Sequence, residues 1–101
     1  MGMRRALAVL VATMPLAACV TPPDTATVFA SARGTGADDA YVVSGVGQEF
    51  EILRLLGVTM DSHARHVING RSFDVLSVRD PATSATRDVW FDISRVIGRG
   101  Y

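Results

Sequence analysis

The sequence predicts a small α+β fold, in which an antiparallel β-meander of three to four strands packs on one helix. Apolar residues at helical spacing in 48–56 predict the helix. The segments 71–79 and 87–93 alternate and are rich in β-forming residues, which predicts two strands. An Asn-Gly pair at 69–70 predicts a hairpin. Because the chain has 101 residues, it accommodates one small domain.

The predicted helix covers residues 48–56. Its apolar stripe consists of Phe50, Ile52, Leu53 and Leu56. Glu49 and Glu51 lie near its first turn, where negative charge complements the helix dipole. Gly57 follows directly, in the position where a left-handed residue commonly ends a helix. The preceding residues 41–43 form either a short strand or the lead-in to the domain.

The turns predict how the strands pair. Asn69-Gly70 is a strong signal for a two-residue type I′ turn. The segment 80–84 has turn composition, with proline suited to its second position. We expect a five-residue loop over 81–85, which pairs Asp80 with Thr86.

This strand register decides which face of the sheet is buried. It pairs Val75 with Phe91 and Phe73 with Ile93. Together with Val89, these side chains form the face that we expect the helix to cover. The other face is then open to a partner.

Charge and composition limit the function classes. The chain has ten arginines, no lysine and ten acidic residues. Without residues 1–18, eight arginines face ten acids, a formal charge of −2. These counts exclude a multi-domain enzyme, a polytopic membrane protein and a disulfide-stapled scaffold. They also argue against nucleic acid as a partner, since no positive cluster is present.

The N-terminal segment predicts export. Arg4-Arg5 precede thirteen mostly apolar residues, a stretch too short to span a bilayer, and small residues follow. Leu16-Ala17-Ala18-Cys19 resembles the lipobox of bacterial lipoprotein precursors. The resemblance implies removal of residues 1–18 as a signal peptide and acylation of Cys19 with palmitate-type chains. A secretory signal with an incidental cysteine, or an uncleaved anchor, is the alternative.

The same resemblance predicts where the protein resides. Lipid chains on Cys19 hold it to a membrane of the cell envelope, facing the periplasm. Val20 follows the cysteine, and the absence of aspartate there favours the outer over the inner membrane. Residues 19–39 are rich in Thr, Ala, Pro, Gly and Asp, so we expect a flexible tether with a possible short strand at 27–32. The α+β domain then spans 40–101.

Two acidic side chains are the first candidates for chemistry. In the expected register Asp74 lies beside Asp92, and adjacent carboxylates shift one another's pKa and share a proton or a cation. Arg65, across from Asp74 in the neighbouring strand, offers a simpler outcome, in which it neutralises the pair as an exposed salt-bridge ladder. We expect the salt-bridge ladder with Arg65 rather than a shared proton or cation.

Two further motifs are weak. Asp61, His63 and His66 have a spacing that zinc accepts, but a strand points the two imidazoles to opposite faces. Ser44-Gly45-Val46-Gly47 lacks the lysine of a phosphate-binding loop and is expected to be a turn into the helix. We therefore predict no catalytic residue, no cofactor and no metal.

The candidate interaction face is the one turned away from the helix, where Leu76 lies beside Trp90 in the expected register. A tryptophan on an exposed surface is a recurrent anchor of protein interfaces. The face comprises Trp90, Leu76, Val78, Val67, Arg65, Asp74 and Asp92. Alternatively, the segment around Val28-Phe29 folds back and covers it.

These observations predict a lipid-anchored envelope lipoprotein that is not an enzyme and serves as an interaction or accessory subunit for another envelope protein. An inhibitor or immunity-type binding protein, with Trp90 as its plug, is the alternative. A small hydrolase or metal-dependent enzyme built on the acidic pair and His66 is the third hypothesis. A domain this small buries a modest core, which favours a role beside a partner.

Overall fold

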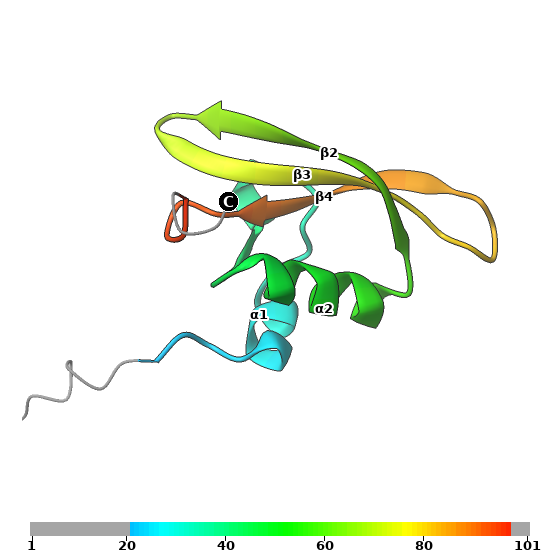
Figure 1. The fold of residues 1–101 in the computed structure, drawn as a ribbon, viewed down its shortest axis with the longest axis horizontal. Coiled ribbons are helices and arrows are strands. Elements are labelled where there is room, and N and C mark those ends of the chain that lie inside the picture. Colours follow the sequence, from blue (N-terminus) through cyan, green and yellow to red (C-terminus); the bar gives the residue numbers. More distant parts are fainter. Residues whose placement is uncertain (1–20, 98–101) are drawn as a thin grey trace, which may run out of the picture.

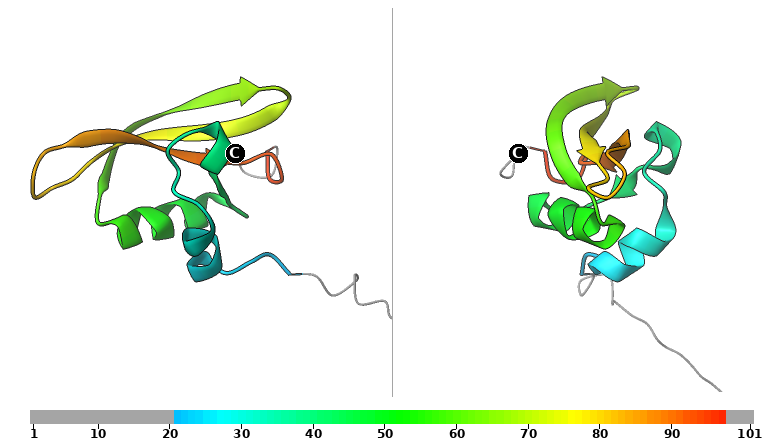
Figure 2. Two further views of the ribbon diagram at one scale, coloured as in Figure 1. Left: turned by 180° about the vertical axis from the view of Figure 1, so that it is seen from behind. Right: turned by 90° about the vertical axis from the view of Figure 1, so that its right-hand side faces the viewer.

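The computed structural model describes residues 21–97, and it confirms the α+β class. Within that range, four strands form one curved sheet with two helices side by side beneath it (Figures 1 and 2). The elements in chain order are α1 (Thr25–Ser31), the 3₁₀ helix η2 (Ala37–Asp39), β1 (Tyr41–Val42), α2 (Val46–Leu56), β2 (Thr59–Ile68), β3 (Arg71–Arg79) and β4 (Thr86–Asp92). No helix of this range is long and apolar enough to cross a bilayer.

The sheet has the strand order β1-β4-β3-β2. Its last three strands form the predicted antiparallel meander. The short strand considered at 41–43 is present as β1, but it runs parallel to β4, with Tyr41 opposite Phe91. The sheet is therefore mixed rather than purely antiparallel, because the chain leaves β1 through α2 and two further strands before β4 returns beside it.

Helix α2 confirms the helix prediction and begins two residues earlier than expected, at Val46. Gly57 ends it in the left-handed conformation, with φ of 73°, and donates its amide to the carbonyl of Arg54. The residues that α2 buries are Glu49, Ile52 and Leu53. Phe50 was expected in that stripe, but 49% of it is exposed. Positions 49, 52 and 53 lie on one face of a helix, and Phe50 lies to the side of that face.

The hairpin between β2 and β3 is also as predicted. Asn69 and Gly70 have φ angles of 52° and 79°, as a type I′ turn requires. Ile68 pairs with Arg71 across the turn, and Arg65 lies opposite Asp74, as expected.

The predicted register between β3 and β4 is wrong by one residue. Arg79, not Asp80, pairs with Thr86, so the loop has six residues. Asp80 instead closes this loop, since its amide donates to the carbonyl of Ala85 at 2.8 Å and its side chain accepts from the amide of Ala82 at 2.8 Å. The shift turns every side chain of β3 to the face opposite the one expected.

The sheet consequently buries side chains on both faces. The helix-side core contains Val28, Tyr41, Val43, Ile52, Leu53, Leu76, Val78, Val89, Phe91, Ile93 and Val96. Phe73 and Val75, predicted to lie under the helix, instead form a smaller cluster on the other face with Ala40. Ala37 of η2 and Trp90 pack against that cluster.

Residues 25–39 belong to the packed domain, which corrects the predicted tether over 19–39. The segment 27–32 is not a strand, because α1 occupies it. Asp24 caps α1 by accepting a hydrogen bond from the amide of Thr27 at 2.8 Å.

Helix α1 packs on the core through two side chains. Val28 is buried, and Phe29 stacks on Tyr41 with ring centroids 6.1 Å apart. The ordered domain therefore begins near Asp24 rather than Ala40. The predicted signal peptide and Cys19 lie outside the described residues.

Candidate interaction surface

The candidate interaction face does not exist as one surface, because the register shift divides it. Trp90 and Asp92 lie on the face of Phe73. The remaining members lie on the helix side, and they are Asp74, Leu76, Val78, Arg65 and Val67. Leu76 and Val78 are fully buried in the main core and cannot contact a partner.

Trp90 is half-buried in the smaller cluster. Its ring packs edge-on against Phe73, with centroids 5.6 Å apart, and lies tilted against His66 at 5.5 Å. Its amide donates to the carbonyl of Gly34 at 2.8 Å. The N-terminal chain does cover this face in part, but with residues 34–40 rather than with Val28-Phe29. Trp90 thus packs at the boundary of a second, smaller core.

The acidic pair is likewise divided. Asp74 and Asp92 project from opposite faces, and each contacts a different basic residue. Asp74 Oδ1 lies 3.3 Å from His63 Nδ1, and Asp92 Oδ2 lies 2.8 Å from Arg71 Nη2. The two carboxylates cannot share a proton, and Asp74 is engaged by His63 rather than by Arg65.

Asp92 is the more tightly held of the two. Burial raises its pKa, but hydrogen bonds from Arg71 and Ser94 outweigh burial and hold the pKa below its usual value. The amide of Ser94 donates to Asp92 Oδ1 at 2.9 Å. The Arg71 guanidinium also lies 4.9 Å from the ring centroid of Phe73. This arrangement fixes the end of β4 against the start of β3, which is a structural role.

Arg71→Ala is expected to lower the free energy of unfolding by about 2 kcal/mol at neutral pH, because a buried carboxylate loses its charged partner. The lowered pKa of Asp92 sets the pH dependence. A carboxylate with a depressed folded pKa stabilises the fold above its unfolded pKa of about 3.9, and this contribution is lost as pH falls through the folded pKa. Urea unfolding should therefore show the difference from wild type shrinking in acid.

Arg79→Ala is the matched control for Arg71→Ala. Arg79 donates to Asp61 at 2.7 Å, but both side chains are exposed, so less than about 1 kcal/mol is expected. Equal losses in the two variants would contradict the structural role of the Arg71–Asp92 pair.

The two histidines do lie on opposite faces of β2. His63 is opposite Leu76 of the helix side, whereas His66 is opposite Phe73 of the other face. One ion therefore cannot bind both. The Ser44–Gly47 segment is a turn into α2, closed by Gln48 Oε1, which accepts from the amide of Ser44 at 3.0 Å.

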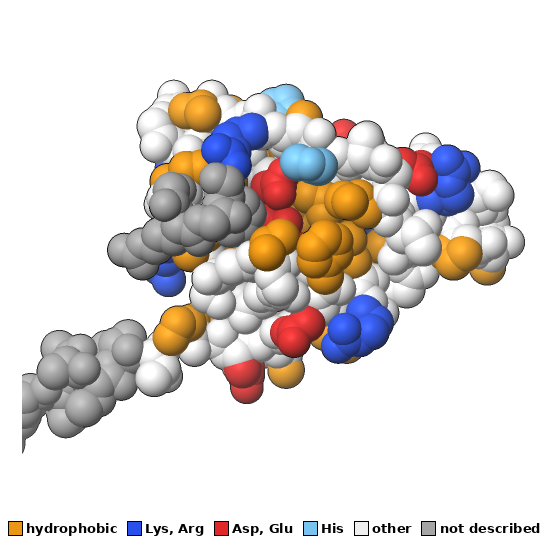
Figure 3. All heavy atoms as spheres, viewed as in Figure 1, with side chains coloured by type: hydrophobic (Ala, Val, Ile, Leu, Met, Phe, Trp, Pro, Cys, Tyr) orange, Lys and Arg blue, Asp and Glu red, His pale blue; other side chains and the backbone are white. Residues whose placement is uncertain are grey.

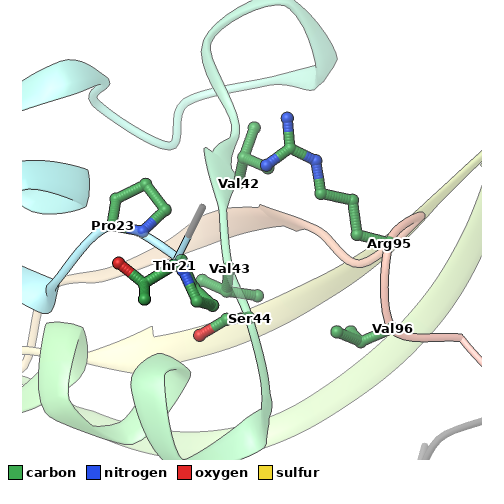
Figure 4. Close-up of a pocket in the computed structure, with 8 residues that line it drawn as sticks. Thr21, Pro23, Val42, Val43, Ser44, Arg95 and Val96 are labelled. Atoms are coloured by element: carbon green, nitrogen blue, oxygen red, sulfur yellow. The ribbon is translucent and has the colours of Figure 1, made fainter. Parts of the chain in front are cut away.

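A pocket of about 470 Å³ opens beside the first described residues (Figure 4). It is lined by Thr21, Pro22, Pro23, Val42, Val43, Ser44, Arg95 and Val96. In Figure 4, the Arg95 side chain extends toward Val42 at one side of the pocket. No sequence motif predicted this site, because its walls come from both ends of the domain.

Strand β2 is exposed along its whole length. It is an edge strand, hydrogen-bonded only to β3, and all ten of its residues are exposed. A β-bulge lies between Met60 and Ser62. An edge strand presents unpaired amide and carbonyl groups, to which another strand can bind. The polar composition of 59–66 on both faces was a signal of this exposure in the sequence.

Comparison of the chain with protein-family models, curated proteins and solved structures gave no match.

Proposed function

We propose that this protein is a lipoprotein of the bacterial cell envelope, anchored by acyl chains on Cys19, whose domain is an interaction or accessory subunit and not an enzyme. The observation that carries the proposal is Leu16-Ala17-Ala18-Cys19 after a cationic and apolar segment. Cleavage before Cys19 leaves a chain with two or more acyl groups, and such chains bind membranes durably. The domain then faces the periplasm, with Val20 favouring the outer membrane.

The start of α1 supports a location close to the membrane. Only five residues separate Cys19 from Thr25, the first residue of that helix. Such a segment spans at most about 20 Å even when fully extended. The pocket next to residues 21–23 is thus the part of the domain nearest to the proposed anchor.

Exposure of β2 supports the interaction role. It is the edge strand opposite β1, which α1 contacts, and it lies far from α1 in Figure 1, so anchoring leaves it accessible. A subunit held by its N-terminus at the bilayer can therefore offer this strand to a neighbouring protein.

Cys19→Ser is expected to abolish incorporation of an alkyne-labelled palmitate in a bacterial host and to leave a precursor that retains residues 1–18. Intact-mass measurement of the membrane fraction checks both results. Leu16→Arg serves as the control, because it keeps the thiol while altering the motif, and it should also prevent labelling. A wild-type chain with a free thiol at Cys19, or label retained in Cys19→Ser, would refute the anchor.

A further inference from the structure

We propose that the free edge of β2 binds an extended acidic segment of another protein, which adds a fifth strand to the sheet. The binding site is the ladder of residues 62–68, which pairs with β3 without interruption. This inference goes beyond the lipid anchor, since it names the partner chemistry that the proposed accessory role requires. It does not depend on acylation.

The turn chemistry shows which backbone groups are available. In a two-residue hairpin the residues flanking the turn, here Ile68 and Arg71, exchange hydrogen bonds. Because antiparallel pairs alternate, the amides and carbonyls of His63, Arg65 and Val67 point away from β3. These three residues offer a continuous row of donors and acceptors to an added strand.

No side chain of residues 62–68 is acidic, and Arg65 provides a positive charge. Residues 62–68 contain one arginine, two histidines and no acid. Asp74, directly opposite Arg65, contacts His63 instead, so Arg65 is available to a carboxylate from outside. Val67 is 67% exposed, the most exposed of the large apolar side chains described. The edge therefore matches a strand with a carboxylate opposite Arg65 and an apolar residue opposite Val67.

A second copy of the chain fits this edge less well than an acidic strand, because no two-fold pairing within residues 62–68 places a carboxylate opposite Arg65. Pairing of two β2 strands about a two-fold axis at Ala64 places His63 opposite Arg65 of the other copy. An axis at Arg65 places two guanidinium groups against each other. An axis at His63 would place Asp61 of one copy opposite Arg65 of the other. The bulge between Met60 and Ser62 interrupts the strand at Asp61, however. Like charges directly opposite destabilise a strand pair.

Helix α2 adds an apolar contact on the same side. Its hydrogen bonds to α1 come from Glu51, which accepts from Thr25, and from Gln48. Val46 and Phe50 lie on the other flank and are 47% and 49% exposed. Figure 3 shows a hydrophobic patch between the sheet and α2, with a histidine and acidic side chains above it. This patch is exposed on the helix side of the sheet, the face to which Arg65 and Val67 also project.

The test uses the full-length protein in detergent and a fluorescent seven-residue peptide, matched in length to residues 62–68. The peptide has one glutamate at its centre, opposite Arg65, and β-branched residues elsewhere, so that one of them lies opposite Val67. We expect binding by fluorescence anisotropy and slower amide exchange in 59–68. Arg65→Glu should weaken binding about tenfold and create binding to the same peptide with lysine for glutamate, because the opposed charges are exchanged. Arg33→Glu, at an exposed loop arginine, should change neither affinity.

Three outcomes would overturn the proposal. The glutamate and lysine peptides could bind the wild-type chain equally well, amide exchange could slow elsewhere than in β2, or β2 could become protected by concentration-dependent self-association. Cys19→Ser should bind the glutamate peptide like the wild type. A lost anchor with intact peptide binding refutes only the proposed localisation, whereas lost binding with an intact anchor refutes only this inference.

Discussion

Replacing Phe91 with alanine is expected to lower the free energy of unfolding by about 4 kcal/mol, which is most of the stability of a domain of this size. Phe91 is fully buried at the centre of the helix-side core. Its ring lies 5.7 Å from that of Tyr41, on the neighbouring strand β1. Truncation leaves a cavity between the sheet and the helices that neither layer can close.

Phe50→Ala is the matched control, since it removes the same atoms from α2 where the side chain is half-exposed. We expect a loss of less than about 1 kcal/mol, because little apolar area returns to water. Urea unfolding followed by far-UV circular dichroism measures both. Equal losses would mean that Phe50 is buried as the helical spacing predicted, and that the observed face of α2 is wrong.

The elements that were predicted correctly are those specified by local chemistry. The end of α2 at Gly57 and the turn at Asn69-Gly70 both need a positive φ, which glycine and asparagine adopt at low cost. The strands next to that turn alternate over enough residues to be recognised. Such signals lie within a few residues and do not depend on the rest of the chain.

The register of β3 against β4 could not be predicted in the same way. Alternation fixes a register only where one face is apolar and the other polar. Here Phe73 and Val75 occupy one face of β3, and Leu76 and Val78 occupy the other, since both faces are covered. A slip by one residue leaves bulky side chains on each face. The predicted register therefore depended on the assumed length of the loop. That length was one residue too short, because Asp80 belongs to the loop and not to β3.

The packing of residues 25–39 on the sheet was missed for a related reason. Residues 25–39 have a composition typical of a linker, and α1 has only seven residues, several of them poor helix formers. Packing of Val28 and Phe29 against the sheet stabilises α1, together with the Asp24 cap. Such tertiary contacts are not visible in the local pattern. The partial covering of Trp90 by residues 34–40 belongs to this missed packing, whereas the division of its face follows from the register shift.

Gly34→Ala is expected to lower the free energy of unfolding by about 3 kcal/mol, from two additive causes. Gly34 has a φ of 68°, where a β-carbon costs about 1 kcal/mol. A β-carbon there would also lie 2.5 Å from Tyr41 Cε2, so the core must shift, at about 1–3 kcal/mol. Because the Gly34 carbonyl accepts the amide of Trp90, the fluorescence of this single tryptophan should change as well.

Gly57→Ala separates the two causes. Gly57 has nearly the same φ, 73°, but a β-carbon there meets no atom within 4 Å. Only the backbone cost of about 1 kcal/mol is then expected, with no change in tryptophan fluorescence. Urea unfolding of both variants measures the difference, which is the cost of displacing Tyr41. A difference near zero would mean that residues 34–40 do not pack on the sheet, and that the Trp90 face is open to a partner after all.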